Sequence, residues 1–136
     1  MVDEQPADDL SVEQIEGDSW GAPPPGSTAL VSRVYELRRK PVGTLTAEDL
    51  RVLIAQQVGL DVVVPRALRR LREDPLLEGD YYPGDVLVAV LKVPAEYWAA
   101  RGGQLAELEA VIAAVDNPDR ELARDIDEFR KRVGSA

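Results

Sequence analysis

The densest group of potentially reactive side chains lies between Glu78 and Asp85, where three carboxylates and two tyrosines occur within eight residues. Carboxylates can form ion pairs with lysine or arginine of a basic partner, and tyrosines are common anchors of protein interfaces. Closely spaced carboxylates can also bind a hard cation such as magnesium, or act as the acid and base of a hydrolase. We interpret the stretch first as an acidic and aromatic contact loop, whose candidate contact residues are Glu78, Asp80, Tyr81, Tyr82 and Asp85.

The same eight residues have an equally strong structural interpretation. Their glycines and Pro83 favour a tight turn, and Asp80 or Asp85 could cap the helix that follows. One of the tyrosines could pack on the core. The metal-binding alternative is weaker, because the spacing of the carboxylates matches no calcium-binding loop. The sequence therefore leaves a contact role and a structural role open for these residues.

A second segment of similar composition, residues 17–21, places Asp18 and Trp20 in a turn framed by two glycines. Three consecutive prolines follow at 23–25 and cannot lie inside a helix, so this part of the chain is expected to be extended. Trp20 is expected chiefly to anchor the extended segment to the core. As the alternative, Asp18 and Trp20 are further candidate residues for contact with a partner.

Histidine and cysteine are both absent from the 136 residues. Disulfides therefore cannot form, the usual zinc ligands are missing, and catalysis by Ser-His-Asp or Cys-His arrangements is excluded. The sequence also contains no glycine loop of the kind that holds a phosphate or a nucleotide. We expect no catalytic residue, no cofactor and no metal, with a carboxylate-based, metal-binding hydrolase as the main alternative.

The formal net charge of −9 disfavours binding to nucleic acids and to anionic membranes, and it favours a basic protein partner. The arginines at 38–39 and 66–72 have no aromatic residues interleaved with them, so they are expected to lie on solvated helix faces and to pair with the protein's own acids. The first ten residues lack the basic start and apolar run of a signal peptide, and the apolar run at 86–91 is too short to span a bilayer. A cytoplasmic protein is expected, with a monomer favoured.

Helices must position these side chains. The spacing of apolar residues predicts an all-α fold, a compact single-domain bundle of about six to seven helices with an extended proline-rich N-terminal segment. Residues 1–10 are expected to form a flexible acidic tail, and residues 11–134 a single domain. The predicted helices cover about 28–39, 46–58, 62–73, 86–91, a short segment after Pro94, 105–115 and 118–133, and a further short helix could form at 11–16.

Local signals predict where several of these helices begin and end. Ser11 and Thr46 are expected N-caps, and Asp49 is expected to complete a capping box with Thr46. Gly59 is predicted to end the helix that Thr46 begins, and Pro65 is placed in the first turn of the next helix. The β-branched run 86–91 could also form a buried strand. We predict a buried helix there, because a lone strand would leave its backbone groups unpaired.

The order of short segments along the chain resembles one family, the immunity proteins of contact-dependent growth inhibition (CDI) systems, of the helical kind. The segments that carry the resemblance are IEGDSWG (15–21), LRRKP (37–41), TAEDLR (46–51), QQVGL (56–60), VPRAL (64–68), DPL (74–76), EGDYYPGDVL (78–87) and YW (97–98). Each segment alone would be weak evidence, whereas the ordered series is specific. The resemblance covers about residues 10–115, so the last predicted helix, 118–133, lies outside it.

The resemblance implies a protein that is not an enzyme. It implies binding to the C-terminal toxin domain of a large secreted effector, which is thereby blocked inside the producing cell or a sibling cell. Many such toxins act on nucleic acids and are basic, so an acidic inhibitor would gain from electrostatically steered association. An adaptor or scaffold protein without a toxin partner is a further interpretation of the sequence.

Overall fold

The structure of the chain is a computed structural model that describes residues 6–134. The chain forms only helices and irregular segments in this range, so the all-α prediction is confirmed. Eight α-helices occur in the described residues, where about six to seven are expected. They are α1 (Val12–Glu16), α2 (Ala29–Arg38), α3 (Ala47–Ala55), α4 (Leu60–Glu73), α5 (Asp85–Leu91), α6 (Ala95–Ala99), α7 (Gly102–Ala113) and α8 (Arg120–Gly134), with 3₁₀ turns at Pro6–Asp9 and Val42–Thr44.

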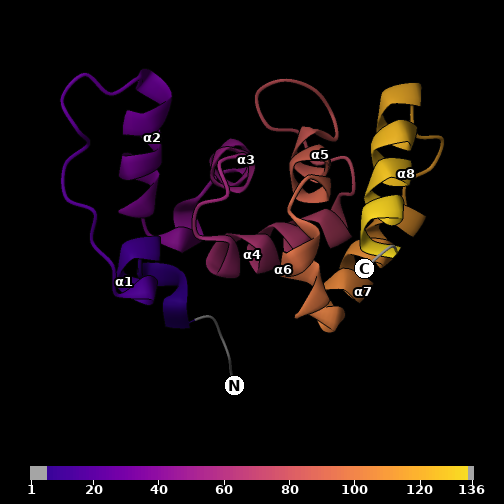
Figure 1. Cartoon of the computed structure of the whole chain (residues 1–136), viewed down its shortest axis with the longest axis horizontal. Coiled ribbons are helices and arrows are strands. Elements are labelled where there is room, and N and C mark those ends of the chain that lie inside the picture. The colour runs from indigo at the N-terminus through magenta and orange to yellow at the C-terminus, as the bar shows by residue number, and fades with distance from the viewer. Residues whose placement is uncertain (1–5, 135–136) are drawn as a thin grey trace.

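Figure 1 shows that the helices follow one another along the long axis of the molecule, from α1 and α2 at one end to α7 and α8 at the other. Helices α3, α4 and α5 lie between these ends. No helix within residues 6–134 combines the length and the apolar character needed to cross a membrane.

The predicted caps of two helices are confirmed. The Ser11 hydroxyl accepts a hydrogen bond from the backbone N–H of Gln14, whose side chain accepts one from the N–H of Ser11. Thr46 and Asp49 form the same reciprocal pair at the start of α3. Each pair satisfies two backbone donors that the first turn of a helix leaves without a partner, so both helices begin where the sequence indicates.

The roles predicted for Gly59 and Pro65 at helix boundaries are wrong, and α7 begins at Gly102, before its predicted start at about 105. Helix α3 ends at Ala55, and Gly59 with φ +65° precedes α4 instead of ending α3. Because α4 begins at Leu60, two residues before the predicted start, Pro65 lies in its second turn and not in its first. Proline is costly inside a helix because it offers no N–H. Burial of the neighbouring Val63 and Val64 in the core offsets this cost.

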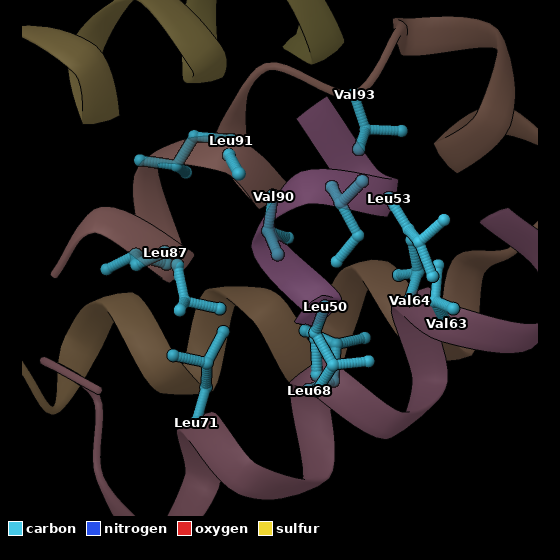
Figure 2. Close-up of a cluster of buried hydrophobic side chains, with 14 of the residues drawn as sticks. Leu50, Leu53, Val63, Val64, Leu68, Leu71, Leu87, Val90, Leu91 and Val93 are labelled. Carbon is cyan, nitrogen blue, oxygen red and sulfur yellow. The ribbon is translucent and has the colours of Figure 1, made fainter. Parts of the chain in front are cut away.

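The centre of the core is formed by α3, α4 and α5. Figure 2 shows leucines and valines of these three helices meeting side by side, among them Leu53 of α3, Leu68 of α4 and Val90 of α5. Almost every side chain of α5 is buried, which confirms the predicted buried helix at 86–91. Trp98 of α6 then packs edge-to-face against Phe129 of α8, with ring centroids 6.2 Å apart, and so joins the C-terminal helices to the core.

Part of the segment expected to be a flexible tail is ordered. Residues Pro6–Asp9 form a 3₁₀ turn, and the Asp8 carboxylate lies 2.7 Å from the guanidinium of Arg66 on α4. The carbonyl of Leu10 accepts a hydrogen bond from the N–H of Val42. These contacts fix residues 8–10 on the domain, whereas residues 1–5 of the expected tail lie outside the described range.

Candidate functional site

The loop between α4 and α5 carries the candidate contact residues Glu78, Asp80, Tyr81 and Tyr82, and we call residues 78–83 the tyrosine loop. It stands beside α3 and leads directly into α5 (Figure 1). All four of these side chains are exposed, Tyr81 to 70% and Tyr82 to 49%. These two tyrosines are the most exposed of the large hydrophobic side chains in the described residues, which makes this loop the strongest candidate contact surface.

Asp85, the fifth candidate of this stretch, has a different role. Its side chain is buried, and its carboxylate accepts backbone N–H groups of Gly79 at 2.6 Å, Tyr81 at 3.1 Å and Tyr82 at 3.5 Å. A carboxylate that is already saturated with internal donors is not available to a partner's lysine or arginine. The interpretation of Asp85 as a contact residue is therefore corrected: it holds the tyrosine loop in shape from inside.

A second carboxylate, Glu48 of α3, holds the loop from the other side. It accepts the backbone N–H of Asp80 at 2.9 Å and forms a two-pronged ion pair with Arg51, whose Nε lies 2.7 Å from Oε1. The Arg51 guanidinium also lies 4.7 Å from the centroid of the Tyr81 ring, a cation–π contact. One face of the exposed Tyr81 ring thus packs on an arginine that its ion pair with Glu48 holds in place.

Two glycines allow the backbone to approach these carboxylates. A Cβ at Gly79 would lie 2.5 Å from the Glu48 carboxylate and 3.1 Å from the Asp85 carboxylate. Any larger residue at this position would therefore push the loop away from both carboxylates. Gly84 has φ +92°, a conformation that side chains other than glycine rarely adopt. The prediction that glycines shape a turn in this stretch is confirmed. The two tyrosines of the turn point to the outside of the molecule.

Asp18 and Trp20 lie in the connection between α1 and α2, separated from the tyrosine loop by α2 and α3 (Figure 1). Trp20 packs on the guanidinium of Arg38 at 3.9 Å and edge-to-face on Tyr35, and its indole N–H donates to Asp18 at 3.3 Å. Trp20 therefore anchors its segment, as expected, but 39% of it is exposed. The structure does not bring the two groups of candidates into one site.

Comparison with protein families tests the resemblance seen in the sequence. A family model described as CDI immunity proteins matches residues 14–108, well over half of the chain. The chain belongs to this family. Comparisons with curated proteins and with solved structures find no match. The CDI resemblance seen in the sequence is confirmed, and the matched residues include both Trp20 and the whole tyrosine loop.

The geometry gives no support to a carboxylate-based metal site in this CDI immunity family member. Within residues 6–134, no group of three acidic side chains is arranged to hold a metal ion. Of the three acids in the stretch 78–85, Asp85 is directed to backbone donors, and Glu78 and Asp80 are exposed. The arrangement is suited to presenting aromatic and acidic groups to another molecule.

Three residues that position the candidates were not singled out from the sequence: Arg38, Glu48 and Arg51. The spacing of Glu48 and Arg51, three residues apart on a predicted helix, is a signal for their ion pair. No such signal exists for Arg38, which is fully buried and pairs with Glu13 and Glu16 from α1. For Arg38 the expected pairing with the protein's own acids is confirmed, whereas the expected solvated position is wrong because α1 and residues 17–20 cover the side chain.

The contribution of Glu48 to stability is expected to depend on pH. The hydrogen bond from Arg51 holds the pKa of Glu48 below its ordinary value of 4.5. A lowered pKa in the folded state means that the unfolded state binds the proton more tightly, so this stabilisation is present above pH 4.5 and is lost as pH falls through the folded pKa. Urea unfolding of Glu48→Gln and the parent chain should give a difference in unfolding free energy that is largest at neutral pH and shrinks at pH 3. A difference that stays constant over this range would contradict the assignment.

Proposed function

We propose that this chain binds the cognate C-terminal toxin domain of a CDI effector and neutralises it by covering its active site or substrate surface. Membership of the CDI immunity proteins supports a toxin partner. The observation that carries the proposal at the level of residues is the tyrosine loop, where two internal carboxylates and Arg51 fix a backbone that carries exposed tyrosines.

The support for binding by this loop is energetic. Ordering a loop at an interface costs free energy, and a loop that is already fixed avoids this cost. Tyrosine supplies a large contact area with few rotatable bonds, so two fixed and exposed tyrosines are efficient anchors. Tyr81 and Tyr82 are the proposed anchors, with Glu78 and Asp80 as acidic contacts beside them.

Charge supports the nature of the partner. At a net charge of −9, the chain would attract a basic toxin domain and speed its association at low salt. Asp18 and Trp20 form a separate proposed contact region, because α2 and α3 lie between them and the tyrosine loop. The proposed complex forms in the cytoplasm, contains one copy of this chain, and involves no catalysis by it.

Replacing Tyr81 and Tyr82 by alanine together is expected to weaken binding of the toxin domain about 30-fold or more, the loss typical of an interface anchor. The measurement is calorimetric titration of the toxin domain encoded immediately upstream, with its activity disabled by mutation. Both tyrosines are exposed, so the helical circular-dichroism spectrum should not change.

Leu30→Ala provides the control, since Leu30 is an exposed apolar residue of α2 away from the loop. The affinity of this variant for the toxin domain should match that of the parent chain. If the parent chain neither binds the toxin domain nor protects cells that express it, the proposed function is wrong. If it binds and the double alanine variant binds equally well, the tyrosine loop is not the contact site.

A further inference from the structure

A pocket of about 420 Å³ lies between the tyrosine loop, α5 and the start of α8. Its apolar walls include Leu76, Pro83, Val88 and Leu122, and the ring of Tyr82 forms part of its lining. This volume lies within the range of pockets that hold small ligands, and it is ample for a whole long side chain. Figure 1 shows α5 between the loop and α8, and residues of all three line the pocket although the loop and α8 are far apart in the sequence.

The charged residues that line the pocket are all acidic: Asp119, Glu121 and Asp125. The Asp119 carboxylate accepts a hydrogen bond from the backbone N–H of Leu122 and so stabilises the first turn of α8. Glu121 and Asp125, one helical turn apart, form no ion pair within residues 6–134. The pocket therefore combines an apolar lining with two carboxylates that lack a cation.

The pKa of the Tyr82 phenol is affected by the acidic side chains around the pocket. Burial raises its pKa above the ordinary value, and the nearby carboxylates of Asp85, Asp125 and Glu121 raise it further. Each of these carboxylates disfavours a second negative charge beside it and favours a positive one. The charges of α8 thus act on the same space that Tyr82 lines.

We propose that this pocket receives one lysine or arginine side chain of the toxin domain, and that α8 thereby helps to determine which toxin is bound. The apolar walls suit the aliphatic stem of such a side chain, and Glu121 and Asp125 suit its charged end. The inference rests on the proposed function and adds to it a second contact beside the tyrosine loop. A second copy of this chain is a poorer occupant, because two molecules of charge −9 repel each other.

The two sides of the pocket differ in their relation to the family. Leu76, Tyr82 and Val88 lie within the matched residues 14–108, whereas Glu121, Leu122 and Asp125 lie beyond them. The carboxylates that would recognise the cation therefore come from a part of the chain that the family match does not cover. This arrangement gives α8 a role in recognition in addition to its packing through Trp98 and Phe129.

The test is the affinity of the Glu121→Gln, Asp125→Asn double variant for the disabled toxin domain. Loss of two partly exposed ion-pairing carboxylates should weaken binding about 10-fold at low salt and less at high salt. The control is Glu36→Gln with Glu96→Gln, which removes the same charge from exposed positions of α2 and α6 and should change the affinity little. Glu121→Gln alone, at an exposed position on the pocket lining, should weaken binding about threefold and serves if the double variant folds poorly.

Double-mutant cycles identify the occupant. Each lysine and arginine of the toxin domain is replaced by alanine in turn. One of these toxin variants should bind the parent chain more weakly than the unaltered toxin domain does, but should bind the Glu121→Gln, Asp125→Asn variant equally well. If the parent binds the toxin and the double variant binds equally well, the pocket proposal is overturned while the proposed function stands. A concentration-dependent dimer that the double variant abolishes would also overturn it, in favour of a second copy. If the parent does not bind the toxin at all, both proposals fail.

Discussion

Asp85→Ala should lower the free energy of unfolding by about 3 kcal/mol, because it removes the acceptor of three backbone N–H groups in a partly buried loop. Some of these donors can reach water once the loop opens, which keeps the loss below the sum of three unsatisfied groups. The measurement is chemical denaturation followed by circular dichroism. The variant should also lose toxin affinity, since Tyr81 and Tyr82 are then no longer held in one position.

Asp80→Ala is the matched control for this prediction. Its carboxylate is exposed, and the contact of Asp80 with Glu48 uses its backbone N–H, which alanine retains. The control should therefore unfold within about 0.5 kcal/mol of the parent chain. Asp85→Asn, which keeps one acceptor oxygen, should fall between the two. Equal stability of the Asp85→Ala and Asp80→Ala variants would show that Asp85 does not hold the loop.

Arg38→Ala is expected to cost about 3 to 4 kcal/mol, because the side chain of Arg38 is fully buried and holds together three parts of the N-terminal region. Its guanidinium pairs with Glu16 at 2.9 Å and Glu13 at 3.3 Å, and donates to the carbonyl of Asp18 at 2.9 Å. Its removal leaves Glu16 without a cation and Glu13 with only the longer contact to Arg39 at 3.9 Å, and it opens a cavity under Trp20. The loss is measured by urea unfolding.

The fluorescence of Trp20 gives a local readout of the same variant. Trp20 packs on Arg38 and is partly exposed, whereas Trp98, the other tryptophan, is buried in the core. Release of Trp20 should shift the emission to the red while the contribution of Trp98 stays constant. The neighbouring Arg39→Ala removes an exposed arginine that bonds the carbonyl of Gly21, and it should cost less than about 1 kcal/mol. An unchanged emission spectrum in Arg38→Ala would contradict the role assigned to Arg38.

The starts of α1 and α3 were predictable because they depend on groups three residues apart. The boxes at Ser11 and Thr46 are local hydrogen bonds, so the residues that make them are visible in the sequence. The end of α3 and the position of Pro65 were not predictable in the same way. Pro65 is tolerated in the second turn of α4 because the neighbouring Val63 and Val64 are buried in the core, and this burial depends on helices that arrive from elsewhere.

For the candidate contact residues, too, some properties depend on the sequence alone and others on the tertiary structure. The sequence alone determined that the chain is helical, that it lacks histidine and cysteine chemistry, and that tyrosines and acids gather at 78–85. Only the tertiary structure decided that Asp85 faces inward while Tyr81 faces outward on Arg51, and that α8 places Glu121 and Asp125 beside Tyr82. A carboxylate looks the same in a sequence whether it bonds its own backbone or a partner. Its role is set by the groups that folding brings within about 3 Å, which come from the same loop for Asp85 and from a segment 32 residues away for Glu48.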